Sequence, residues 1–493
     1  MNLLHLPLLE LAIAITLLGS PCVSRVRNPE RAYRWGVAII GASFGCTVLA
    51  WLAFYVGTPP ESLARYSIQP ALFGRQIFAL DELNAPILPT VALLHLLTAV
   101  STSRTFMRRY SFSWSMAAET IQLATLSCKE PWVLIALLAI SAVLPYVELL
   151  NRRRPTRVYV LHMAVFVVLL VLGWSAVTLE GGLSAQVPWW SAVPLMAAIL
   201  VRCGTVPTHC WVTDWFEHAS PGIALLFVVP LSGVYAAVRL VLPIGPGWVL
   251  QSIGLLSLFT AIYAAAMATI QRETRRFFAY LFLSHSSLVL VGLELHTELS
   301  LTASLCLWFS VILSLGGFGL TLRALEARFG RLSLSDYHGL YEHTPALAVC
   351  FLLTGLACVG FPGTLGFISI ELLVDSAVDA SPYVGIIVIA AGALNGIAVL
   401  RAYFFLFTGA RHVSTVSLGI GLRERAAVLS LSALILGGGL FPQRGVATRQ
   451  RAAEEILQDR RKRLHLEKPI PYDETVSTPV ERPIIQAQSS HAS

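Results

Sequence analysis

Several ionisable side chains in this sequence stand inside, or at the ends of, long apolar stretches. An ionisable group near the middle of a bilayer costs about 2.5–3.5 kcal/mol even on a lenient insertion scale, so each such group calls for an explanation. The candidates are Glu130, Arg202, Arg275, His285 and Glu371, with Glu119 and Gln122 in a further apolar stretch. A row of groups that exchange protons, or bias the exchange, is suited to moving charge through a membrane.

Each of these groups also has a structural interpretation. Glu130 could interact with the dipole of the helix that follows it, and Arg275 could be an ordinary charge of a cytoplasmic loop. His285 could be a hydrogen-bonded core histidine, and Glu371 could face the outer interface. Arg202 is harder to explain in this way, because it stands beside an interruption of its apolar stretch. The residues alone leave both interpretations open.

Two apolar stretches are interrupted by glycine and proline. The first interruption contains Gly204 and Pro207, and the second contains Gly360, Pro362 and Gly363. Interrupted helices at corresponding places in two halves are typical of transporters built from inverted repeats. The pattern predicts two inverted five-helix repeats in which spans seven and twelve are broken and these residues act as hinges. The alternative is that glycine and proline are simply common in membrane helices.

Composition predicts an all-α polytopic membrane protein. Of the 493 residues, 56% are hydrophobic and 13% are charged, whereas a soluble domain has roughly 25% charged residues. The apolar stretches approach the ~20 residues that cross a bilayer. They predict about 14 transmembrane helices, near 3–22, 34–56, 83–102, 110–128, 131–149, 157–178, 188–212, 220–242, 247–271, 276–294, 298–324, 344–377, 382–408 and 424–442.

These spans divide the chain into a membrane domain and a tail. We expect residues 1–442 to form the transmembrane domain, with repeat one at about 110–242 and repeat two at about 247–408. Residues 443–493 are polar and predict a largely disordered tail that contains one short helix at 452–464.

Lysine and arginine are distributed unevenly between the loops. Alternate loops, starting after the first span, hold 21 of these residues with their flanks, whereas the intervening loops hold only Arg65, Arg75 and Lys129. Because positive charge accumulates in cytoplasmic loops, this distribution predicts a multi-pass protein of the cell (inner) membrane with its N-terminus outside. An even number of spans would leave the basic tail outside, so either one span is miscounted or the tail does not control topology.

Other functional classes lack support in the sequence. The eight cysteines form no CxxC pair, and neither GxGxxG after a strand nor GxxxxGK[ST] occurs, which argues against iron–sulfur, dinucleotide and ATP binding. Cys203, His209 and Cys210 lack a fourth metal ligand. The net charge of +7 comes with arginines clustered in loops, so no nucleic-acid surface is indicated. We expect no cofactor, no metal and no catalytic site in this chain.

Two segments resemble signatures of a known family. Residues 202–214 (RCGTVPTHCWVTD) and 271–285 (QRETRRFFAYLFLSH) resemble those of the antiporter-like membrane subunits, namely subunits L, M and N of NADH:quinone oxidoreductase and the large Mrp antiporter subunits. Residues 78–81 and 400–404 agree as well. The resemblance extends from about residue 75 to 442.

The resemblance implies a proton-translocating subunit that works with other subunits of a membrane complex. By motif position, Glu130 would be the glutamate of span five, while Arg202 and Arg275 occupy lysine positions. Arginine cannot release a proton at accessible pH, so Arg202 would bias Glu130 rather than relay a proton. His285 and Glu371 would continue the pathway.

The sequence departs from the family pattern at several ionisable positions. Cys306, Ser310 and Ile370 fall where the family carries histidine, lysine or glutamate. These departures are similar to those expected of the membrane subunit of the DAB inorganic-carbon uptake complex, in which a large zinc-binding soluble partner uses the proton gradient to drive CO2 hydration. A non-conducting structural membrane anchor is a further alternative.

Overall fold

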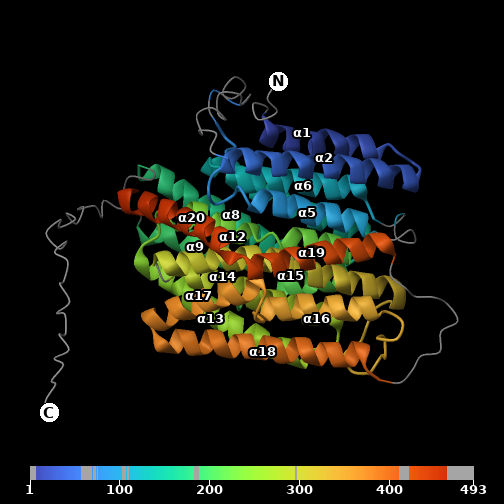
Figure 1. Cartoon of the computed structure of the whole chain (residues 1–493). Helices are drawn as coiled ribbons and strands as arrows, with labels where there is room; N and C mark the ends of the chain where they lie inside the picture. Colours follow the sequence, from blue (N-terminus) through green and yellow to red (C-terminus); the bar gives the residue numbers. More distant parts are fainter. Residues whose placement is uncertain are drawn as a thin grey trace, which may run out of the picture.

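The computed structural model describes residues 7–56, 69, 74, 76–102, 107, 110–181, 188–294, 297–409 and 421–463. In this part of the chain long helices lie roughly parallel to one another, from α1 (Leu8–Ser24) and α2 (Pro29–Tyr55) at one edge to α18 (Pro382–Phe407) at the other (Figure 1). Helices satisfy their backbone hydrogen bonds internally, which apolar surroundings demand. The predicted all-α membrane architecture is confirmed.

The uninterrupted helices follow the predicted apolar stretches closely. Besides those named, they are α5 (Ile87–Val100), α6 (Phe112–Ser127), α7 (Pro131–Asn151), α8 (Arg157–Leu179), α13 (Gly247–Ile270), α14 (Thr274–Glu294), α15 (Glu298–Phe329) and α19 (Leu422–Leu440). Among the described residues, eight helices are long and apolar enough to cross a membrane, or up to nine if a bent pair counts as one span. The count of about 14 stays a prediction.

Both predicted interruptions are present. The helices on either side of them are α9 (Trp189–Cys203) and α10 (Cys210–His218), and α16 (Pro345–Val359) and α17 (Leu365–Ala380). Each first half ends in a left-handed glycine, Gly204 with φ 72° and Gly360 with φ 87°. Glycine adopts this conformation without steric cost, which makes it the usual residue after a helix end. The proposed boundaries of the two repeats stay a prediction.

A third interruption was not predicted from the sequence. The stretch expected to be one span consists of α11 (Pro221–Val228), α12 (Ser232–Ala236) and the π-helical η3 (Ala237–Val241). Pro230 lies between α11 and α12, and proline cannot donate the hydrogen bond that would continue the helix. The carbonyl oxygen of Pro230 instead accepts a bond from Trp308 Nε1 at 3.1 Å.

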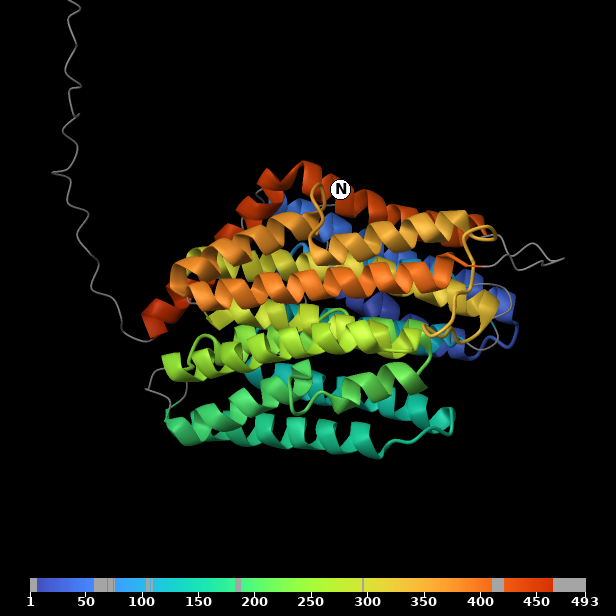
Figure 2. The same cartoon turned by 90° about the horizontal axis from the view of Figure 1, so that it is seen from below.

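The last described helix, α20 (Pro442–Arg463), turns away from α19 by 82° partway along the bundle, beside the second interruption (Figure 2). It is longer than the short helix expected at 452–464. Its buried arginines, Arg449 and Arg460, donate to main-chain carbonyl oxygens of Glu82, Leu83, Leu242 and Gly245. The helix α20 therefore contacts both the turn before α5 and the connection between η3 and α13, two segments that are distant in sequence. Residues 464–493, most of the expected tail, lie outside the described residues.

Candidate functional site

Arg202 lies in the last turn of α9, directly before the first interruption. The residue is only 6% exposed. Its guanidinium group donates to Ser232 Oγ at 2.7 Å and lies 4.5 Å from the centre of the Phe227 ring. None of the ion pairs between described residues involves Arg202. A buried cation without a counter-ion is costly, and its field acts strongly on neighbouring groups because the local dielectric is low.

The unwound backbone beside Arg202 is held by side chains of neighbouring helices. Trp211 Nε1 donates to the carbonyl oxygen of Val201 at 2.8 Å, and Thr260 Oγ1 accepts from the Val206 amide at 3.0 Å. Because these bonds replace those that a continuous helix would make, the interruption persists within the bundle.

Substituting alanine at Gly204 should destabilise the interruption. A Cβ atom there would lie 2.7 Å from Val212 Cγ2, on a backbone with φ +72°. We expect a loss of about 1–3 kcal/mol, because strain and a clash act together. The thermal midpoint of the purified protein checks this. Gly392→Ala is the control, since nothing lies within 4 Å of a Cβ at that α18 position. Equal midpoints for the two variants would contradict the prediction.

A second group of buried polar side chains connects α5, α6 and α11. His95 Nε2 lies 2.9 Å from Gln122 Oε1, and the Gln122 amide donates to the carbonyl oxygen of Leu226 at 2.5 Å. Glu119 lies one turn before Gln122 on the same face of α6. It is fully buried, and the Ser43 hydroxyl of α2 faces its carboxylate, but no hydrogen bond of ordinary geometry joins either carboxylate oxygen to a described residue.

A third group lies on α14. His285 is 1% exposed, and neither ring nitrogen has a hydrogen-bond partner among the described residues. The preceding Ser284 accepts a bond from Asn395 Nδ2 of α18 at 2.8 Å. One turn earlier, Phe282 lines the same small cavity as Arg202. His285 therefore lies one turn from a residue beside the interruption, and among the described residues it lacks the hydrogen bond that the structural interpretation expects.

These three groups form one row through the bundle, which we call the buried polar row and define as Glu119, His95, Gln122, Arg202 and His285. Its first part meets α11 at Leu226, and Arg202 meets the same helix at the adjacent Phe227. The row thus passes from α5 and α6, along α11, to the interruption and on to α14. Sequence reasoning noted every member except His95.

The other predicted residues lie apart from this row. Glu130 precedes the first residue of α7, at the end of the bundle. Arg275 forms an ion pair with Glu326 of α15 at 2.7 Å and donates to the carbonyl oxygen of Ala219 at 3.0 Å. It therefore connects the start of α14 to the last turns of α15 and to the end of α10. Glu371 lies on an exposed face of α17. Of the five predicted pathway residues, Arg202 lies beside the first interruption and His285 lies one turn beyond Phe282, which lines the cavity next to Arg202.

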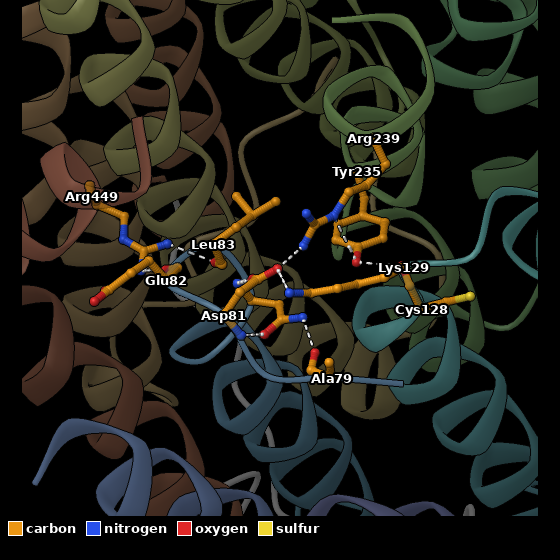
Figure 3. Close-up of polar contacts among 10 residues, drawn as sticks. Ala79, Asp81, Glu82, Leu83, Cys128, Lys129, Tyr235, Arg239 and Arg449 are labelled. Atoms are coloured by element: carbon orange, nitrogen blue, oxygen red, sulfur yellow. Dashed lines mark hydrogen bonds and ion pairs between the residues drawn. The ribbon is translucent and has the colours of Figure 1, made fainter. Parts of the chain in front are cut away.

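A further polar cluster was not anticipated (Figure 3). The Asp81 carboxylate, in the turn before α5, binds Arg239 of η3 and the Lys129 ammonium at 3.3 Å. Arg239 Nε also donates to the Tyr235 hydroxyl, which in turn donates to the carbonyl oxygen of Cys128. The cluster joins the α6–α7 connection, where Glu130 lies, to the end of η3.

Replacing Asp81 by alanine should destabilise the protein by about 1–3 kcal/mol, because Arg239, whose side chain is only 21% exposed, would lose its carboxylate partner. Burial alone would raise the pKa of Asp81. The positive charges of Arg239 and Lys129 more than offset this effect, so the pKa of Asp81 lies below its usual value. The stabilisation is therefore present above pH ~4 and lost as the pH falls through the lowered pKa. Thermal midpoints against pH check this. Glu82→Ala, which removes only a half-exposed pair with Arg451, is the control; a larger loss there would contradict the prediction.

Parallel apolar helices with interruptions, and buried ionisable groups beside one of them, define a polytopic membrane protein of the transporter type. Comparison with known proteins agrees. The family model described as NADH:quinone oxidoreductase/Mrp antiporter, TM, matches residues 159–395. Over these residues the chain resembles the antiporter-like membrane subunits.

Individual relatives of known sequence are similar to this chain over about half of its length. The chain is 28% identical over 287 residues to NADH-quinone oxidoreductase subunit N of Thiobacillus denitrificans, covering 56% of this chain and 58% of that protein. It thus spans little more than half the length of this curated relative.

Two solved structures share the fold. A chain of the Mrp complex from Dietzia sp. DQ12-45-1b has a TM-score of 0.79 at 18% identity, covering 93% of this chain and 100% of that one. A chain of respiratory complex I from Thermus thermophilus has a TM-score of 0.79 at 22% identity, covering 92% and 99%.

Proposed function

We propose that this chain is a proton-translocating membrane subunit of a multi-subunit complex of the NADH:quinone oxidoreductase/Mrp antiporter type. Its place would be the cell (inner) membrane, with the N-terminus outside. The observation that supports the proposal is the buried polar row, which holds a carboxylate, two imidazoles and, beside an interrupted helix, a guanidinium group with no counter-ion among the described residues. Among the described residues, His285 and the Glu119 carboxylate make no hydrogen bond of ordinary geometry, and burying such groups costs free energy that a purely structural core would not need to bear.

The row suggests how charge would move. Glu119, His95 and His285 can each gain and lose a proton, whereas Arg202 keeps its charge. In a low-dielectric interior, a proton that arrives at one group changes the proton affinity of the next, so the groups titrate together. Arg202 would favour the ionised form of a nearby carboxylate and disfavour protonation of a nearby imidazole. Glu130, Arg275 and Glu371 lie outside the row and would act at the ends of this path.

The decisive experiment isolates the complex before testing it. An affinity-tagged copy is purified from its native membrane in mild detergent, its partners are identified, and the complex is reconstituted into vesicles with a pH-sensitive dye inside. Co-purification of oxidoreductase or antiporter subunits, with proton flux that depends on this chain, is the expected result. A complex that carries no proton flux would overturn the proposal.

Two alternatives are resolved by the same purification. A non-conducting anchor is favoured by the exposure of Glu371 and by the inability of Arg202 to release a proton; it would assemble normally and show no flux of its own. A DAB-type complex for CO2 hydration is suggested by Cys306, Ser310 and Ile370 at altered positions. In that case one large soluble subunit that contains zinc would co-purify.

A further inference from the structure

The end of the bundle opposite α20 contains a pocket of about 260 Å³. It lies where α11 and α14 begin, where α15 ends and where α19 packs against α15. Its wall includes four arginines and two glutamates: Arg152, Arg275, Arg323, Arg331, Glu326 and Glu424. This is the end at which the arginine-rich loops meet, and the charge distribution predicts that it faces the cytoplasm.

The positive charge of the pocket exceeds the negative charge. Glu326 is already paired with Arg275, and Glu424 is paired with Arg328, a residue outside the lining. Arg323 and Arg331 form no ion pair with any described residue. Two guanidinium groups are therefore left to attract an anion.

Both guanidinium groups are held in place by neutral partners. Arg323 donates to the carbonyl oxygen of Thr98 at 2.7 Å and to Thr102 Oγ1 at 2.8 Å. Arg331 donates to the carbonyl oxygen of Glu217 at 2.9 Å. Such bonds fix the position of each group without cancelling its charge.

The start of α11 opens into the same pocket. No side chain caps this helix start, and Ser220, Pro221 and Gly222 all line the pocket. The Ser220 hydroxyl is buried and has no hydrogen-bond partner within the described ranges. A Cβ at Gly222 would lie 3.2 Å from the Arg323 guanidinium, so the helix start and this arginine converge. A helix N-terminus beside guanidinium groups is suited to phosphate oxygens.

We propose that this pocket binds a phosphate-bearing anion, supplied either by the headgroup of an anionic phospholipid or by free phosphate. The uncapped start of α11 and the Ser220 hydroxyl would donate to the phosphate oxygens, and Arg323 and Arg331 would neutralise its charge. Basic pockets between membrane helices on the cytoplasmic side are suited to anionic headgroups. The exposed Arg331 marks the mouth through which a headgroup would enter.

The test uses the full chain, purified and stripped of lipid in a neutral detergent. Binding is followed by native mass spectrometry and by thermal midpoint, with three probes: short-chain phosphatidylglycerol, short-chain phosphatidylcholine, and sodium phosphate at matched ionic strength. We expect Arg331→Gln and Ser220→Ala each to weaken binding of the anionic probe roughly tenfold, the usual effect of removing one hydrogen bond to a charged group. Arg154→Gln, an exposed arginine of a neighbouring loop outside the lining, is the matched control and should leave binding unchanged.

The probes distinguish the two sources. Binding of phosphatidylglycerol in preference to phosphatidylcholine and to phosphate supports a lipid headgroup, and equal binding of inorganic phosphate supports the free anion. Failure of both anionic probes to bind overturns the proposal. So does unchanged binding in both variants. Two variants are used because Arg331→Gln affects a surface connection, whereas Ser220→Ala removes only a hydroxyl group and retains the fold.

Discussion

Replacing Glu119 by glutamine should reduce proton flux through the assembled complex by at least tenfold while leaving assembly intact. Glutamine has nearly the same shape, so it fits the fully buried site on α6, but it cannot take up or release a proton. A positioned group that transfers protons commonly contributes 10²–10⁴-fold to a rate. The measurement is dye-reported proton flux in vesicles, normalised to the amount of complex recovered.

The control for this experiment is Glu30→Gln. Glu30 is an exposed carboxylate in the first turn of α2, away from the buried polar row. Glu30→Gln removes the same charge by the same substitution, but outside the row. Proton flux of the complex that contains this variant should therefore equal the wild-type flux. Wild-type flux in Glu119→Gln would remove this carboxylate from the pathway, and loss of assembly in the same variant would show that its role is structural.

Arg202 should be replaceable by lysine but not by methionine. Both substitutes are unbranched chains that fit beside Phe227, but only lysine keeps a positive charge near the interruption. We expect Arg202→Met to lose at least tenfold in flux, because the field that biases neighbouring proton sites disappears. Its stability should be unchanged or higher, since exchanging a buried charge for an apolar group of similar size is often neutral or stabilising.

The two Arg202 variants distinguish a role in charge movement from a role in folding. Thermal midpoint and proton flux are measured on the same preparations of each variant. Arg202→Lys should keep a substantial part of the flux, although it loses the planar contact with Phe227 and the geometry of the bond to Ser232. If Arg202→Met keeps full flux, the guanidinium group is not part of the pathway. If it only lowers the midpoint, the group is structural.

Much of the fold follows from the sequence because membrane helices obey simple rules. Apolar length locates the helices, and Gly204 and Gly360 locate the two predicted interruptions, since each ends its helix in a conformation that favours glycine. The break at Pro230 was missed. One proline inside an apolar stretch is compatible with a kinked but continuous helix, and only packing shows that the backbone opens there.

The functional side chains were harder to predict than the helices. A sequence shows that Glu371 lies in an apolar stretch, but not which face of α17 carries it, and the structure puts it on an exposed face. Similarly, Arg275 stands at a family position but is paired with Glu326, which is 51 residues further along the chain. His95 drew no attention, because a lone histidine gains significance only through its neighbour, Gln122.

The exposed position of Glu371 affects the stability in the membrane of a copy of this chain that has not assembled with the proposed partner subunits. Glu371 lies six residues into α17 after the second interruption, about 9 Å along the helix, so in the proposed membrane subunit its exposed carboxylate would face the hydrocarbon region. An orphan copy must therefore either protonate this side chain or bear a cost of about 2.5–3.5 kcal/mol. A neighbouring helix that brings a cation to this face would relieve that cost. The penalty makes an orphan copy chemically distinct from an assembled one, which is the kind of difference that a membrane quality-control protease can detect.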